Sequence, residues 1–178
     1  YLILFFNLSV FKQTIMKKLL LLVIVFNIIS LLSFSQDDFA KIQTDFEKMM
    51  KDPKNIYGKN KAVGKYYDIR GFKMYAEVYG QGKPLLFIHG NGGSINNFTK
   101  QIPYFSQKYK VIIADSRAQG KSSDMADSLS YEMMADDYAA LLDAMKIDSA
   151  YVVGWSDGGI NGLLMATRHP EKVKKLAI

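Results

Sequence analysis

Cysteine is absent from the 178 residues of this sequence. Disulfide bridges, zinc sites built on thiolates, a cysteine nucleophile and a lipid-modified lipoprotein cysteine are therefore excluded. Internal repeats and low-complexity tracts are also missing. Hydrophobic residues make up 49% of the chain and charged residues 22%. This is the composition of a globular domain, and it excludes disorder, collagen and a continuous coiled coil.

Acidic residues are missing from residues 1–35, which hold three lysines. From Gln36 onward, 20 basic residues stand against 17 acidic ones and leave a net charge of +3, compared with +6 for the whole chain. The lysines of this remainder are scattered, and no basic stripe alternates with aromatic residues. A nucleic acid partner is therefore not expected.

Residues 16–35 have the layout of a secretory signal peptide. Two lysines follow Met16, an apolar run covers residues 19–34, and small residues suit cleavage before Gln36. The alternative is a membrane anchor, because the run is only slightly short of a full span. In both cases the rest of the chain is expected outside the cytoplasm, secreted or periplasmic, with membrane contact only if the segment is retained. Residues 1–15 precede a better start at Met16, and we interpret them as upstream translation.

Residues 36–65 are predicted to form a short helix followed by a linker. Apolar residues at spacings of three and four indicate a helix over residues 37–51, which Asp52 and Pro53 end. From Tyr66 the pattern changes, and two alternating stretches on either side of Gly71 predict a β-hairpin.

The remainder, to Ile178, alternates between apolar runs and helical patterns. Continuous apolar runs predict buried parallel strands at residues 85–88, 111–114 and 150–153, with a fourth strand beginning at Val173. Helical stripes lie between them. One covers residues 98–109, where Pro103 either kinks the helix or marks its true start, and one covers residues 134–145 with Ser130 as its N-cap. This order predicts an α/β fold with a mostly parallel sheet led by an antiparallel hairpin.

A G-x-S-x-G motif follows the third apolar run and opens a helical pattern. Residues 154–159 read GWSDGG. A turn this sharp strains the backbone of Ser156 and exposes its hydroxyl, and only glycine leaves enough room at positions 154 and 158. The N–H of Asp157 then points at the reacting carbonyl. The alternative is a glycine-rich turn with an unreactive serine.

A second glycine-rich loop, HGNGGS at residues 89–94, follows the first apolar run. It can bring the N–H of Asn91 to the same oxyanion. We interpret His89 as a residue that orders this loop rather than as a catalytic one. A dinucleotide-binding fingerprint would need glycine at position 95, where the sequence has isoleucine.

Residues 115–122, DSRAQGKS, end like a phosphate-binding P-loop. The first glycine of that motif would fall at position 115, where an aspartate would repel phosphate. A nucleotide-binding function is therefore not expected.

These three motifs, in this order and at this spacing, resemble the α/β-hydrolase fold, and GWSDGG is similar to the serine esterase-like branch that includes valacyclovir hydrolase. The resemblance covers residues 66–178. It implies Ser156 as nucleophile, Asn91 and Asp157 as oxyanion-hole residues, a small-molecule acyl substrate, and neither a cofactor nor a metal. Asp115 and Arg117 match a loop that is structural in the family. The one departure there is Ala118, where the family usually has glycine.

The acid and the histidine of the family's catalytic triad are expected after the serine. The only later histidine is His169, which a helix of thirteen residues would place roughly 20 Å from the serine, at about 1.5 Å per residue. We therefore expect a fragment of an exported serine hydrolase, truncated before the last strands and the lid and inactive alone. The alternative is a non-catalytic binding protein or pseudo-enzyme of the same fold.

Overall fold

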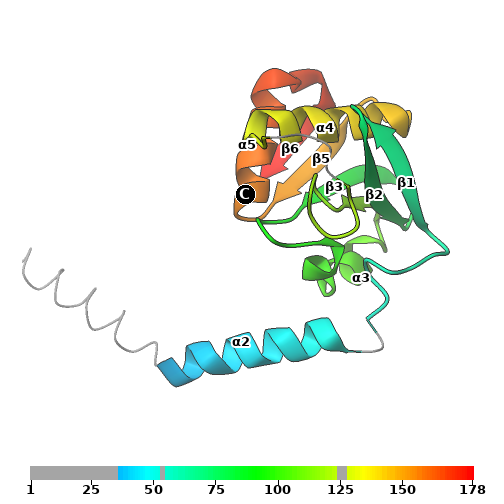
Figure 1. Ribbon diagram of the computed structural model, residues 1–178. Coiled ribbons are helices and arrows are strands. Elements are labelled where there is room, and N and C mark those ends of the chain that lie inside the picture. Colours follow the sequence, from blue (N-terminus) through cyan, green and yellow to red (C-terminus); the bar gives the residue numbers. More distant parts are fainter. Residues whose placement is uncertain (1–35, 53–54, 124–127) are drawn as a thin grey trace, which may run out of the picture. The chain divides into compact units, whose positions relative to one another are not determined.

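The computed structural model describes residues 36–52, 55–123 and 128–178 (Figure 1). The chain divides at Met50 into two units. The proposed signal peptide and the fifteen residues before it lie outside the described residues.

Helix α2, Gln36–Lys51, supplies the described residues of the first unit, and its last two residues belong to the second unit. Its bounds agree with the predicted helix, which ends where proline follows Asp52. Two of its apolar side chains, Phe39 and Ile42, are exposed. No helix among the described residues is long and apolar enough to cross a membrane.

The second unit is built on one six-stranded sheet in the order β1-β2-β4-β3-β5-β6. Strands β3 to β6 are parallel to one another, and the hairpin β1–β2 joins them through an antiparallel pairing of β2 with β4. This confirms the predicted α/β class with a mostly parallel sheet. The bounds are β1 Gly64–Ile69, β2 Phe72–Tyr79, β3 Lys83–Ile88, β4 Tyr109–Ala114, β5 Ala150–Gly154 and β6 Val173–Ala177.

Helices α4, Tyr131–Ala144, and α5, Asp157–Arg168, pack against each other over one face of the sheet (Figure 1). Alternate residues of the strands meet them, because successive side chains of a strand point to opposite faces. Fully buried side chains such as Leu86, Ile112 and Tyr138 form this core. The predicted N-cap is confirmed, because the Ser130 hydroxyl accepts a hydrogen bond from the Met133 N–H.

The opposite face is covered by the short helices η1, Ile95–Phe98, and α3, Gln101–Phe105. The prediction of one kinked helix over residues 98–109 is wrong at both ends. Phe98 belongs to η1, and Tyr109 begins β4. Both residues still face the same core, which is why their spacing resembled one helical stripe.

The segment before β1, predicted as a linker, is bound to the sheet. The N–H groups of Gly58 and Asn60 donate to the buried carboxylate of Glu77 on β2. Hydroxyls of Tyr75 and Tyr79 donate to the same carboxylate, so four donors surround it. The sheet domain therefore begins about ten residues earlier than the sequence pattern indicated.

Candidate active site

Ser156 lies in the turn between β5 and α5, at the carboxyl end of the central parallel strands. Its backbone has φ 56° and ψ −123°, a conformation that a residue with a side chain adopts only under strain. The residue is exposed to solvent. The turn therefore presents its hydroxyl at the sheet edge, as the G-x-S-x-G motif predicts.

The two glycines of the motif have no room for a side chain. A Cβ atom at Gly154 would lie 2.1 Å from the carbonyl oxygen of Gly158. A Cβ atom at Gly158 would lie 2.1 Å from the carbonyl oxygen of Ile88, on the neighbouring strand β3. The close packing of the first turn of α5 against the end of β5 thus depends on Gly154, and its packing against β3 depends on Gly158, for the steric reason that the sequence suggested.

The loop after β3 lies directly against this turn. The N–H of Trp155 donates to the carbonyl of Ile88, and a Cβ atom placed on Gly90 would lie 3.1 Å from the Cβ of Ser156. Asn91, the next residue, is exposed. The fold therefore brings the loop of Asn91 to the two consecutive residues Ser156 and Asp157, as the sequence analysis expected.

Asp157 is the first residue of α5, so its N–H lies at the positive end of the helix dipole. Its side chain turns to the start of α4. There a hydrogen bond to Asp157 raises the pKa of Tyr131, with smaller contributions from burial and from the negative charge. Tyr131 lies at the edge of the site and was not predicted from the sequence. Its contact joins the starts of two different helices, and such a contact leaves no local sequence pattern.

His89 is almost completely buried. Its Nε2 accepts a hydrogen bond from the N–H of Ser116 at 2.9 Å, and its Nδ1 lies 2.8 Å from the carbonyl oxygen of Gly90. The ring is therefore neutral with its proton on Nδ1, and both nitrogens are engaged within the protein. Burial lowers the pKa of His89 from its usual value, against opposing contributions of the Gly90 carbonyl and of Asp115. This is the geometry of the loop-ordering histidine that we expected.

Asp115 ties the loop after β4 to the loop after β3. Its carboxylate accepts hydrogen bonds from the N–H of Ile95 and the N–H of Lys121, each at 2.8 Å. Burial raises the pKa of Asp115, and these two donors act in the opposite direction. The carboxylate occupies the concave side of the loop, 2.3 Å from where a Cβ of Gly120 would stand. The N–H of Lys121, which a P-loop would offer to phosphate, thus donates to the Asp115 carboxylate instead.

Helix α4 fixes the β4 loop through two buried contacts. The Arg117 guanidinium forms a bidentate ion pair with Asp137, with both distances 2.8 Å, and lies 4.0 Å from the ring centroid of Phe72. The hydroxyls of Ser116 and Tyr138 are 2.8 Å apart. Ala118 stands where the family usually has glycine. Its φ is 60°, so alanine adopts here a left-handed conformation that favours glycine.

His169 lies beyond the opposite end of α5 from Ser156. Its Nε2 is 2.7 Å from Asp136, whose carboxylate also pairs with Arg168 and Arg70. The hydrogen bonds of Arg168, His169 and Arg70 hold the pKa of Asp136 well below its usual range, against the effect of burial. His169 therefore joins α5 to α4 and is not placed to act on Ser156.

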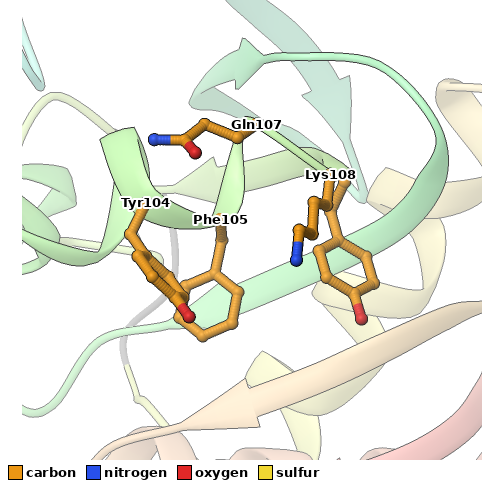
Figure 2. A pocket seen from close by; sticks show the side chains of 5 residues that line it. Tyr104, Phe105, Gln107 and Lys108 are labelled. Carbon is orange, nitrogen blue, oxygen red and sulfur yellow. The ribbon is translucent and has the colours of Figure 1, made fainter.

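A cavity of about 260 Å³ lies beside Tyr104, Phe105, Gln107 and Lys108, near the amino ends of β3 and β4 (Figure 2). In Figure 2 the Gln107 side chain points away from the Phe105 ring. Ser156 follows the carboxyl end of β5, so this cavity is not its acyl pocket. No group of three or more acidic or histidine side chains that could hold a metal ion occurs within the described ranges.

Comparison with known proteins shows the family to which the sheet domain belongs. The family model described as alpha/beta hydrolase fold matches residues 83–178, which is more than half of the chain. RutD of Azorhizobium caulinodans, named as a carbamate hydrolase, is 35% identical over 105 residues, 59% of this chain and 40% of that protein. The 2-hydroxymuconate semialdehyde hydrolase of Pseudomonas sp. is 32% identical over 120 residues, 65% of this chain and 42% of that protein.

A solved structure agrees with these relatives. Est816, described as an N-acyl homoserine lactone degrading enzyme, superposes with a TM-score of 0.61 at 34% identity, over 63% of this chain and 43% of that chain. The chain thus spans about two fifths of the length of the curated relatives it matches. By sequence and by structure, it belongs to the α/β-hydrolase fold family.

Proposed function

We propose that this chain carries the nucleophile of a serine hydrolase that cleaves an ester, amide or related acyl bond of a small molecule. The Oγ of Ser156 attacks the acyl carbonyl, the bond to the leaving group breaks, and water then hydrolyses the acyl-enzyme. The N–H groups of Asn91 and Asp157 donate to the oxyanion of the tetrahedral intermediate.

The strained turn at Ser156 is the single observation that carries this proposal. A backbone in this conformation costs about 1–3 kcal/mol, and such strain persists mainly where a function requires it. A glycine-rich turn with an unreactive serine would need neither the positive φ of Ser156 nor the two side-chain-free positions around it. Relatives named as a carbamate hydrolase and a semialdehyde hydrolase support a small-molecule acyl substrate without selecting one.

Neither histidine of the sequence is placed to act as the general base of this reaction. The two histidines of the sequence are His89, whose ring nitrogens are both engaged, and His169, which binds Asp136. A serine hydroxyl without a base is a poor nucleophile at neutral pH. These observations favour a second candidate when the chain acts alone, a non-catalytic binding protein of the same fold.

Replacing Ser156 with alanine in a full-length protein that carries this segment tests the proposal. We expect kcat for a nitrophenyl ester to fall by about 10⁶-fold, as when the nucleophile of a serine protease is removed. Thermal unfolding should barely change, because one hydroxyl is lost from an exposed turn. Hydrolysis close to the original rate would refute the role of Ser156.

We also propose that the protein is exported, on the basis of the lysine pair and apolar run of residues 16–35. N-terminal sequencing of the exported protein should begin near Gln36. A cytoplasmic protein that retains Met16 would contradict this proposal.

A further inference from the structure

The ring of His89 has no place for a second proton. Its Nε2 accepts the Ser116 N–H at 2.9 Å, and its Nδ1 donates to the Gly90 carbonyl. Protonation would put a hydrogen on Nε2, directly facing the N–H of Ser116. Two donors at this distance repel each other, and the buried N–H of Ser116 would lose its acceptor.

Movement at His89 passes directly to the candidate site. Gly90 accepts the Nδ1 hydrogen bond and lies against Ser156, and Asn91 follows it in the chain. The Gly90 carbonyl also accepts from the N–H of Gly93, which closes the loop as a turn. His89 thus links the N–H of Ser116 on one side to the segment that carries the Asn91 N–H on the other.

The charged and titratable groups next to His89 and the adjoining residues Ser116 and Arg117 come from two elements. The β4 loop contributes Asp115, whose negative charge favours the imidazolium form. Helix α4 contributes Tyr138, whose hydroxyl contacts that of Ser116, and the Asp137 carboxylate, which pairs with Arg117. Asp115 thus opposes the burial that disfavours the charged ring, but it already accepts the N–H groups of Ile95 and Lys121.

We propose that His89 is a positioning residue that makes the oxyanion loop sensitive to pH: the neutral ring holds Asn91 in place, and the protonated ring releases it. This inference rests on the proposed function of Asn91 as an oxyanion donor. The pKa of His89 is lowered by burial, so release occurs below the usual histidine range near pH 6.5. The unfolded chain binds the proton more readily, so stability falls as the pH drops below 6.5.

Nuclear magnetic resonance titration of the full chain tests the coupling without any need for activity. The spectra should show His89 with its proton on Nδ1 at neutral pH. Between pH 7.5 and 4.5, the Asn91 amide signal should shift with one apparent pKa below 6.5. The shift should disappear in the non-titrating variant His89→Gln, with His89→Asn as a second such variant. It should persist in the matched control His169→Gln, which removes the other histidine.

Labelling of Ser156 by a fluorophosphonate in added imidazole gives the functional readout. The readout is the labelling rate of the wild type divided by that of His89→Gln at the same pH. In this ratio the pH dependence of imidazole itself cancels. We expect this ratio to be nearly constant above pH 7 and to fall by up to about 10²-fold below the pKa of His89, the effect of one lost oxyanion donor.

An Asn91 shift that is flat in the wild type, or unchanged in His89→Gln, would overturn the inference. Loss of the Ile112 amide signal at the same pH would also overturn the inference. Protonation of His89 would then unfold the whole core rather than move the loop. If Ser156 is labelled in no variant at any pH, the proposed function fails, while the titration still decides whether His89 controls the loop.

Discussion

Two loops at the carboxyl edge of the sheet are built in opposite ways. The loop after β4 is buried at its start, where Asp115, Ser116 and Arg117 each have hydrogen-bonding partners inside the protein. The turn after β5 is exposed and strained at Ser156. The difference separates two tasks: one loop fixes the geometry, and the other presents Ser156, the proposed nucleophile, on that fixed frame.

The largest effect on stability is expected where the supporting loop loses its central acceptor. Asp115→Ala leaves the buried N–H of Ile95 without its acceptor, at about 1–3 kcal/mol, and the partly buried N–H of Lys121 at a smaller loss. Urea denaturation followed by circular dichroism measures the loss. The exposed carboxylate of Asp148 provides the matched control, Asp148→Ala, which should stay within about 0.5 kcal/mol of the wild type. Equal effects of the two variants would show that Asp115 does not hold the loops together.

A smaller effect of opposite sign is expected at the strained turn. Ser156→Gly removes the side chain that makes the positive φ costly, so the free energy of unfolding should rise by about 1 kcal/mol. Ser156→Ala keeps the side-chain penalty and should leave stability unchanged. The same denaturation experiment applies, and a glycine variant less stable than the alanine variant would show that the turn is not strained.

The parallel strands and the serine turn could be read from the sequence because both depend on local pattern. Apolar runs marked the buried strands, and the glycines around Ser156 marked the turn. Strand β4 begins two residues before its apolar run. Its first two residues, Tyr109 and Lys110, are only half buried and were therefore not marked by the apolar pattern. The kinked helix was predicted wrongly because residues of η1, α3 and β4 share one core and mimic a single stripe.

The supporting contacts were not predicted because their partners are distant in sequence. Nothing near Asp115 indicates that its carboxylate meets the N–H of Ile95, twenty residues earlier. Glu77 did leave a signal. Strand alternation places it on the same inward face as Tyr75 and Tyr79, and a carboxylate flanked by two tyrosines indicates a buried hydrogen-bonded cluster.

We propose that the fold presents Ser156 as a nucleophile for which neither histidine of the sequence is placed as the base. Added imidazole can act as that base. The most direct measurement exposes the full chain to a fluorophosphonate with and without imidazole and maps the adducts by mass spectrometry. We expect Ser156 to be labelled slowly without imidazole and faster with it. The Ser156→Ala variant should carry no adduct at this position. Labelling that imidazole does not accelerate, or that spreads equally over other exposed serines such as Ser130, would contradict this proposal.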